Sequence, residues 1–334
     1  MRSLLLLLVP ALASGQSWIA QASGTTASLR GVSAVDDRIV WASGTGGTWL
    51  RTIDGGASWQ AAQVPGAEAL DFRAVAAVDA RTAYLLSVGE AAKSRIYKTS
   101  DAGAHWSLQF TNPDAEGFLD GLAFRDAAHG IALGDPVNGR FVLLATEDGG
   151  DHWERRRAPA AMPGEGAFAA SNRSLALAGT SEVWFASGGP GGARVFHSRD
   201  GGRTWTMAAT PVRKDGTSAG IFGLAFSDGR HGIAIGGDYD KPGESSRNIA
   251  LTSDGGETWS KPEGAPPAGY RSAVAWLADR KAWIATGTSG SDISTDGGNS
   301  WHTFDSGNFN ALSFHASGGW AVGPGGRVAV FRWK

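Results

Sequence analysis

Arginine recurs at one position relative to an aromatic residue in this sequence. The spacing is 11 residues in three cases: Arg30 before Trp41, Arg73 before Tyr84 and Arg173 before Trp184. The related positions elsewhere in the chain are Asp120, Phe222, Asn310 and, with an offset of one residue, Arg271. Because a guanidinium keeps its charge and has five N–H donors, a ring of four arginines favours an anionic ligand such as a carboxylate.

Acidic residues near these arginines offer a second interpretation. Asp120 occupies one of the equivalent positions, and Asp135, Asp238 and Asp240 fall in loops between the second and third strands of a repeat. Each arginine would then pair with an acid and hold neighbouring units together, and the sequence leaves both interpretations open. The candidate binding set is therefore Arg30, Arg73, Asp120, Asp135, Arg173, Phe222, Asp238, Tyr239, Arg271 and Asn310.

A second set of acids recurs in six copies of the motif Ser/Thr-x-Asp-x-Gly-x-x-Trp. These aspartates are Asp54, Asp101, Asp148, Asp200, Asp254 and Asp296. Asp-Gly-Gly suits a tight turn, since the carboxylate accepts bonds from nearby N–H groups and glycine tolerates positive φ. With one aspartate in each repeat, we assign them a structural role and predict no catalytic residue. The motif also lacks the ligand series of a calcium loop, so we predict no metal and no cofactor.

The elements that position these residues are repeats separated by 47, 47, 52, 54 and 42 residues. This period is typical of β-propellers, in which each repeat is one four-stranded antiparallel blade. In one repeat we expect strands over residues 72–78, 81–87 and 95–99 and a fourth strand that begins at Trp106.

A seventh blade is predicted from the two ends of the chain. Residues 309–333 supply three strands, and a strand at Ser17 and Trp18 supplies the fourth, which closes the ring and removes open sheet edges. The prediction is thus an all-β, seven-bladed propeller in which the starts of the innermost strands surround one mouth of a central channel. The four arginines are expected to converge there.

The beginning of the chain and its composition limit the location and the partners. Residues 1–13 have the apolar stretch and small-residue cleavage pattern of a signal peptide, so residues 14–334 are expected to form one exported domain, periplasmic or extracellular. The sequence has no cysteine, and no apolar stretch is long enough to cross a membrane. A formal net charge of −2 argues against nucleic acid as the partner. We expect a monomer.

The repeated motifs carry a resemblance to a known family. Residues 252–259 (Thr-Ser-Asp-Gly-Gly-Glu-Thr-Trp) and 282–287 (Ala-Trp-Ile-Ala-Thr-Gly) resemble the Asp-box propellers, and among them the photosystem II stability and assembly factors and their non-photosynthetic relatives. The resemblance implies a scaffold that holds a segment of a client protein through an arginine-rich patch. It thus favours a partner with acidic groups and a function without catalysis.

Carbohydrate binding or a sialidase-like glycoside hydrolase activity is the alternative, since sialidases also carry Asp boxes. Sialidases resemble this chain less closely, because they carry an Arg-Ile-Pro motif that is absent here. Of the four tyrosines that would supply a nucleophile, Tyr84 and Tyr97 fall in strand patterns rather than in loops.

Overall fold

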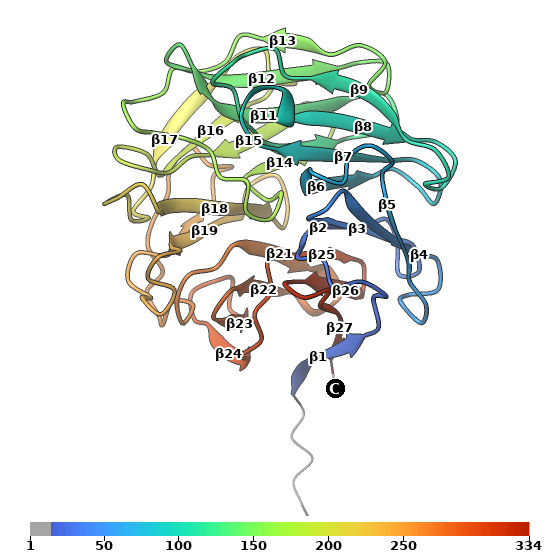
Figure 1. The fold of residues 1–334 in the computed structure, drawn as a ribbon. Coiled ribbons are helices and arrows are strands. Elements are labelled where there is room, and N and C mark those ends of the chain that lie inside the picture. The colour runs from blue at the N-terminus through green and yellow to red at the C-terminus, as the bar shows by residue number, and fades with distance from the viewer. Residues whose placement is uncertain (1–14, 334) are drawn as a thin grey trace, which may run out of the picture.

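The computed structural model describes residues 15–333, so the predicted signal peptide lies outside the described residues. Within residues 15–333 the chain forms seven antiparallel sheets, which are the blades of a propeller (Figure 1). Each innermost strand contacts those of its two neighbours, and the last contacts the first. The innermost strands are β2 (Leu29–Ala34), β6 (Asp71–Ala77), β10 (Leu119–Phe124), β14 (Leu175–Ala178), β18 (Ala219–Phe226), β21 (Ala273–Leu277) and β25 (Ala311–His315).

The second and third strands of each blade lie successively farther from the channel. The second strands are β3 (Val40–Gly44), β7 (Ala83–Val88), β11 (Gly130–Val137), β15 (Glu182–Ala186), β19 (Gly232–Asp238), β22 (Ala282–Gly287) and β26 (Gly318–Val322). The third strands are β4 (Thr48–Thr52), β8 (Arg95–Thr99), β12 (Arg140–Thr146), β16 (Arg194–Ser198), β20 (Ile249–Thr252), β23 (Gly290–Ser294) and β27 (Val328–Trp333).

The outer strands are shorter, and one is reduced to a single bridge. They are β5 (Gln60–Gln63), β9 (Ser107–Thr111), β13 (Glu154–Arg156), β17 (Thr206–Ala209) and β24 (His302–Asp305). In the fifth blade only the pair Leu251 and Ser260 takes this place. Helical structure among the described residues is limited to two 3₁₀ turns, η1 (Ala91–Lys93) and η2 (Ala278–Arg280), and no helix there could cross a membrane.

The predicted ring closure is confirmed. The strand β1 (Gln16–Gln21) pairs antiparallel with β27 and completes the seventh blade, with Trp18 opposite Phe331 (Figure 1). Trp18 also packs against Phe309, and its indole N–H donates to Ser291 Oγ of the sixth blade at 3.0 Å. The first strand of the chain therefore fastens the last blade to its neighbour as well as filling it.

The hydrophobic core lies between blades rather than within them. Each of the seven apolar clusters combines side chains from two adjacent blades. In one cluster Trp106, from the second blade's Asp box, packs against Trp41 and Trp49 of the first blade. Trp106 is only partly buried, as are four of the other five Asp-box tryptophans, because they lie at the outer end of these interfaces.

One segment crosses the central channel. Residues 166–173, here called the channel segment, run from the third blade to β14 and bond to strands on several sides. Ser171 Oγ donates to Ser272 O at 2.6 Å, and Asn172 exchanges two hydrogen bonds of 2.8 Å with the backbone of Leu122. Asn172 has a φ of +61°, a left-handed conformation that asparagine tolerates better than most residues. The channel is consequently divided into two separate mouths.

Candidate functional site

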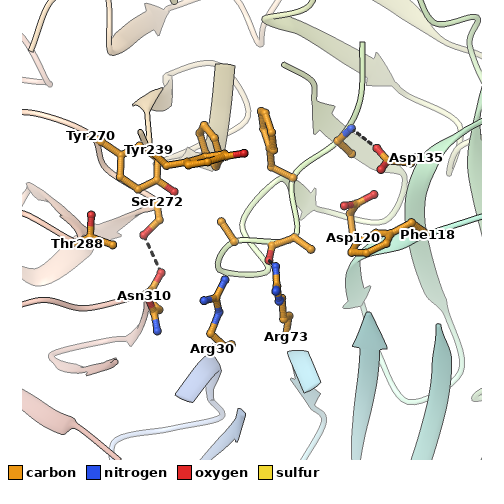
Figure 2. Close-up of a pocket in the computed structure, with 15 residues that line it drawn as sticks. Arg30, Arg73, Phe118, Asp120, Asp135, Tyr239, Tyr270, Ser272, Thr288 and Asn310 are labelled. Atoms are coloured by element: carbon orange, nitrogen blue, oxygen red, sulfur yellow. Dashed lines mark hydrogen bonds between the residues drawn. The ribbon is translucent and has the colours of Figure 1, made fainter. Parts of the chain in front are cut away.

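A cavity of about 530 Å³ occupies one mouth of the channel (Figure 2). We call this end the arginine mouth, because Arg30 and Arg73 line it. Its floor is the first part of the channel segment, from Ala167 to Ala170. The cavity has an arginine side, an acidic side and an aromatic side, which come from different blades. The residues used below are Arg30, Arg73, Asp120, Asp135, Phe168, Phe222, Tyr239, Tyr270, Ser272 and Asn310.

The same backbone irregularity presents four of these side chains to the cavity. The pairing between first and second strand shifts by one residue at Leu29/Gly31, Phe72/Ala74, Leu119/Gly121 and Ile221/Gly223. The residues left unpaired at these bulges are Arg30, Arg73, Asp120 and Phe222. A β-bulge redirects its extra side chain, and here it turns one side chain per blade into the channel mouth.

A glycine at the end of the second strand gives the bulged chain room. A Cβ on Gly44 would lie 2.4 Å from Ser28 O, and a Cβ on Gly287 would lie 2.4 Å from Tyr270 O. A larger residue in place of this glycine would displace the backbone just before the residue that faces the mouth. The glycine that recurs near the end of the second strand therefore indicates which first-strand residue faces the mouth. An alignment based on the 11-residue spacing alone misses this indication.

The two arginines of the mouth differ in their partners. Arg73 Nε donates to Asp71 Oδ2 at 2.8 Å, and a second nitrogen donates to Ala169 O in the channel segment at 3.4 Å. Arg30 forms no side-chain hydrogen bond to any residue in 15–333, and its Nε is buried without a partner. Burial and the nearby charge of Arg73 lower the pKa of Arg30. Arg30 is thus a partly buried cation whose Nε lacks an acceptor.

The acidic side of the cavity consists of Asp120 and Asp135 (Figure 2). The side chain of Asp120 is buried, and its Oδ2 has no hydrogen-bond partner. Burial, and then the charge of Asp135, raise the pKa of Asp120 well above its ordinary value. Burial likewise raises the pKa of Asp135 to about 6, although its Oδ1 accepts a bond from Ala167 N at 2.9 Å.

Aromatic rings form the third side of the cavity. Phe168 of the channel segment stacks on Phe222 with ring centroids 4.0 Å apart. Tyr270 meets the edge of Phe222 at 4.9 Å, and Tyr239 does so at 6.0 Å. Tyr239 is about half exposed, so its ring is accessible from solvent. Phe168 and Tyr270 were not predicted, since they lie outside the aligned positions of the repeat.

The prediction that Arg271 lines this mouth is wrong. The backbone of Gly287 approaches Arg271 as that of Gly44 approaches Leu29, so Ser272 takes the mouth position, and Ser272 lines the cavity. The Arg271 side chain is fully buried and pairs with Asp292 at 2.6 Å. This arginine is an internal ion pair, as the structural interpretation expects.

The prediction that Arg173 lines the arginine mouth is also wrong. Arg173 is at the equivalent place in the repeat, but its blade has no bulge there, because the chain reaches β14 through the channel segment. Its side chain lines a cavity at the other end of the channel, and Nε and a terminal nitrogen donate to Leu312 O at 3.2 and 3.0 Å. We call this end the far mouth.

The remaining predicted residues lie at or near the arginine mouth. Asn310 lines the cavity, and its backbone carbonyl accepts a bond from Ser272 Oγ at 2.7 Å (Figure 2). Asp238 does not line it, since it is buried and its Oδ1 accepts bonds from Ser218 Oγ and Asp240 N at 2.7 and 3.0 Å. Asp238 thus shapes the loop that carries Tyr239.

The Asp-box aspartates bond within their own turns. Asp54 accepts hydrogen bonds from Thr52 Oγ1 at 2.7 Å and from the N–H and hydroxyl of Ser58 at 3.0 and 2.6 Å. These bonds lower the pKa of Asp54, and bonds from His105 lower that of Asp101 to about 2. These contacts are those of turn residues. They lower the pKa of the Asp-box aspartates, whereas burial raises the pKa of Asp120 and Asp135 at the mouth. No group of three or more potential metal-ligating residues occurs in residues 15–333.

Together these features define a class of protein. It is a β-propeller whose channel is blocked by a segment of its own chain and whose arginine mouth holds a cavity lined by charged and aromatic residues. Comparisons with known proteins agree with the propeller fold. Residues 110–225 match the family model described as Photosynthesis system II assembly factor YCF48. Over 138 residues, 41% of this chain, the sequence is 28% identical to photosystem II assembly lipoprotein Ycf48 of Synechococcus sp. (strain CC9902). The match spans about a third of that relative's length.

Solved structures extend the similarity to nearly the whole fold. A structure described as YCF48 bound to D1 peptide superposes with a TM-score of 0.69 and 20% identity, covering 97% of this chain and 99% of the other. YCF48 from Cyanidioschyzon merolae gives 0.68 at 18% identity, over 94% and 98% of the two chains. The resemblance to the assembly-factor propellers that the sequence predicts is therefore confirmed.

Proposed function

We propose that this chain is an exported, non-enzymatic propeller that holds an acidic segment of a client protein at the arginine mouth. The observation that carries the proposal is the Arg30 guanidinium, which lines the cavity without an acceptor and lies beside Arg73. The Nε of this partly buried side chain is left without an acceptor, which is costly, and a carboxylate matches the guanidinium donors with two oxygens. An acidic side chain of a client supplies that acceptor.

The shape of the site supports a peptide segment as the ligand. A cavity of about 530 Å³ admits a few side chains, and the channel segment prevents passage through the ring. The exposed ring of Tyr239 gives a flat apolar surface at the rim. Large aromatic residues beside arginine are frequent at the centres of protein interfaces.

The relatives support the same choice. One similar structure holds a D1 peptide, and the curated relative is an assembly lipoprotein by name. Extended to this chain, these descriptions suggest an exported assembly or stability factor whose client is a membrane-associated protein. Fractionation of the source cells tests the location, and recovery of the chain in the cytoplasm would contradict it.

Binding of short acidic peptides tests the function. Capped peptides that contain one aspartate in a glycine background, titrated by fluorescence anisotropy, are expected to bind the wild-type protein. Arg30→Ala is expected to weaken binding about tenfold or more, since a hydrogen bond between charged groups is worth roughly 1.5 to 3 kcal/mol. The matched control is Arg81→Ala, which removes an exposed arginine away from the cavity. Equal affinity of wild type and Arg30→Ala would contradict the proposal.

Hydrolysis of glycosides is the rival outcome. Tyr239 and Tyr270 line the cavity with two arginines, a partial likeness to a sialidase site. No glutamate lines the cavity to activate a tyrosine, and burial raises the pKa of Tyr270, which opposes its use as a nucleophile. Turnover of sialosides or aryl glycosides that is lost in Tyr270→Phe would replace peptide binding as the function.

A further inference from the structure

The acidic side of the arginine mouth is not explained by an acidic client. Asp120 and Asp135 face the same cavity as the arginines, from the neighbouring strands β10 and β11 (Figure 2). The side chain of Asp120 is only 2% exposed, yet its Oδ2 accepts no hydrogen bond from the described residues. A buried carboxyl oxygen that lines a cavity without a donor requires one from a ligand or solvent.

The nearby cations do not satisfy this pair. Arg73 faces Asp120 from β6, but its hydrogen bonds go to Asp71 and to Ala169 O. Within residues 15–333, neither Asp120 nor Asp135 forms an ion pair with a basic side chain. The hydrogen bond that Asp135 accepts occupies Oδ1 only. The pair thus leaves carboxylate oxygens facing the cavity that a cation can use.

An organic cation fits this pair better than a metal ion. Calcium takes six to eight oxygen ligands, whereas this cavity offers two carboxyl groups, and no third metal-ligating side chain is grouped with them in the described chain. A protonated amine has three N–H donors and no acceptor, so it can bond both carboxylates.

We propose that Asp120 and Asp135 form a cation subsite that receives a protonated primary amine, such as a lysine side chain, from the client segment. The inference rests on the proposed function, because it deepens the chemistry of the same mouth. The preferred client segment is then dipolar, with an acidic group at Arg30 and a lysine at the acid pair.

Proton linkage gives this subsite a second signature. Burial raises the pKa of both carboxyl groups, that of Asp135 to about 6, and so favours their protonated forms when the cavity is empty. An arriving ammonium favours the ionised form, so binding releases a proton, and affinity rises as pH increases through the pKa of Asp135, about 6. The other charged or titratable groups that line the same cavity are Arg73 on β6, Arg30 on β2 and the tyrosines 239 and 270.

Three peptide series separate this subsite from the proposed function. Capped glycine peptides carry an aspartate alone, a lysine alone, or both residues with glycine spacers of increasing length between them. Titration calorimetry of the wild-type protein is expected to give the highest affinity for one spacer length of the third series. Replacing lysine by norleucine in that peptide is expected to weaken binding about tenfold or more. Repeating the titration in two buffers of different ionisation enthalpy is expected to show a released proton.

The variants are Asp120→Asn and Asp135→Asn, with Asp279→Asn in η2 as the matched control. Either mouth variant is expected to remove the preference for lysine over norleucine and the proton release, while the aspartate-only peptide binds as before or better. Thermal unfolding checks that both variants fold.

If the aspartate peptide binds but lysine adds nothing in the wild type, the subsite is wrong and the proposed function stands. If the lysine peptide alone binds, the subsite stands and the proposed function is wrong. Calcium binding in place of amine binding would also overturn the inference.

Discussion

The two mouths of the channel are built from the same seven strands, and they differ in how their polar groups are bonded. At the far mouth the charged Arg173 donates twice to Leu312 O, and Asn172 satisfies both backbone groups of Leu122. At the arginine mouth Arg30 has no acceptor and Asp120 Oδ2 has no donor. The far mouth thus satisfies these polar groups within the protein, whereas the arginine mouth leaves Arg30 Nε and Asp120 Oδ2 for the proposed ligand.

This difference shows that residue type and repeat position do not define a site. Arg30 and Arg173 align in the sequence, yet one lies in a bulge facing solvent and the other ends a segment that crosses the channel. Arg271, one residue from its aligned position, belongs to the interior. Unbonded polar atoms beside a cavity identify the functional end more directly than the arginines do.

The largest effect is expected from Arg271→Ala. The substitution leaves Asp292 as a buried carboxylate without its cation, a change that costs about 3 to 5 kcal/mol. Urea unfolding of the variant measures this loss, and Arg280→Ala in the exposed turn η2 is the control. A loss below about 1 kcal/mol would contradict the structural role of this buried ion pair.

Arg173→Ala is expected to destabilise the protein by roughly 1.5 to 3 kcal/mol, since it removes a charged donor that ties the channel segment to the seventh blade. Peptide affinity at the arginine mouth is expected to stay within about twofold of wild type. Unfolding and binding measured on the same preparation separate the two effects. If the variant is stable but binds peptide poorly, Arg173 contributes to binding, and the two mouths act as one site.

Asp135→Asn is expected to change the pH dependence of stability. The pKa of Asp135 is raised from about 3.8 when unfolded to about 6 when folded, so the folded state binds more protons between these values. The contribution of Asp135 to wild-type stability therefore falls as pH rises from 4 to 6, and the asparagine variant avoids this loss. Its relative free energy of unfolding is expected to increase by up to about 2 kcal/mol over that range, as measured by unfolding at both pH values. A difference that is independent of pH would contradict the assignment.

The smallest effect on stability is expected from Arg30→Ala, although its effect on binding is large. Arg30 makes no side-chain hydrogen bond within the described chain, so the free energy of unfolding is expected to change by less than about 0.5 kcal/mol. The same denaturant titration tests this value. A loss as large as that of Arg173→Ala would show that both mouths are structural.

Much of the fold follows from local signals in the sequence. The Asp-box turns are bonded within eight residues, so they recur wherever the motif recurs, as the contacts of Asp54 with Thr52 and Ser58 illustrate. Ring closure was predicted because Ser17 and Trp18 repeat the Ser-Trp pair of an Asp box. The Asp-box turn depends on near neighbours alone, whereas ring closure joins β1 to β27 and was recognised from the repeated Ser-Trp pattern.

The site was less predictable, because it depends on departures from the repeat. Arg30, Arg73 and Asp120 were found, since each occupies a bulge in a regular blade. The channel segment has no counterpart in the other blades. The repeat pattern therefore could not predict that Arg173 faces the far mouth or that Phe168 lines the arginine mouth. The one-residue error at Arg271 was avoidable, because Gly287 marks the same close approach as Gly44.

The channel segment also has a topological consequence. A ring with an open bore must capture a polymer by its end or open to release it. A bore blocked by residues 166–173 makes the mouth a docking cap instead. Such a cap can be placed on a projecting loop or chain end of a protein already built into a larger assembly. It can then be lifted away along the same axis, without unfolding either molecule.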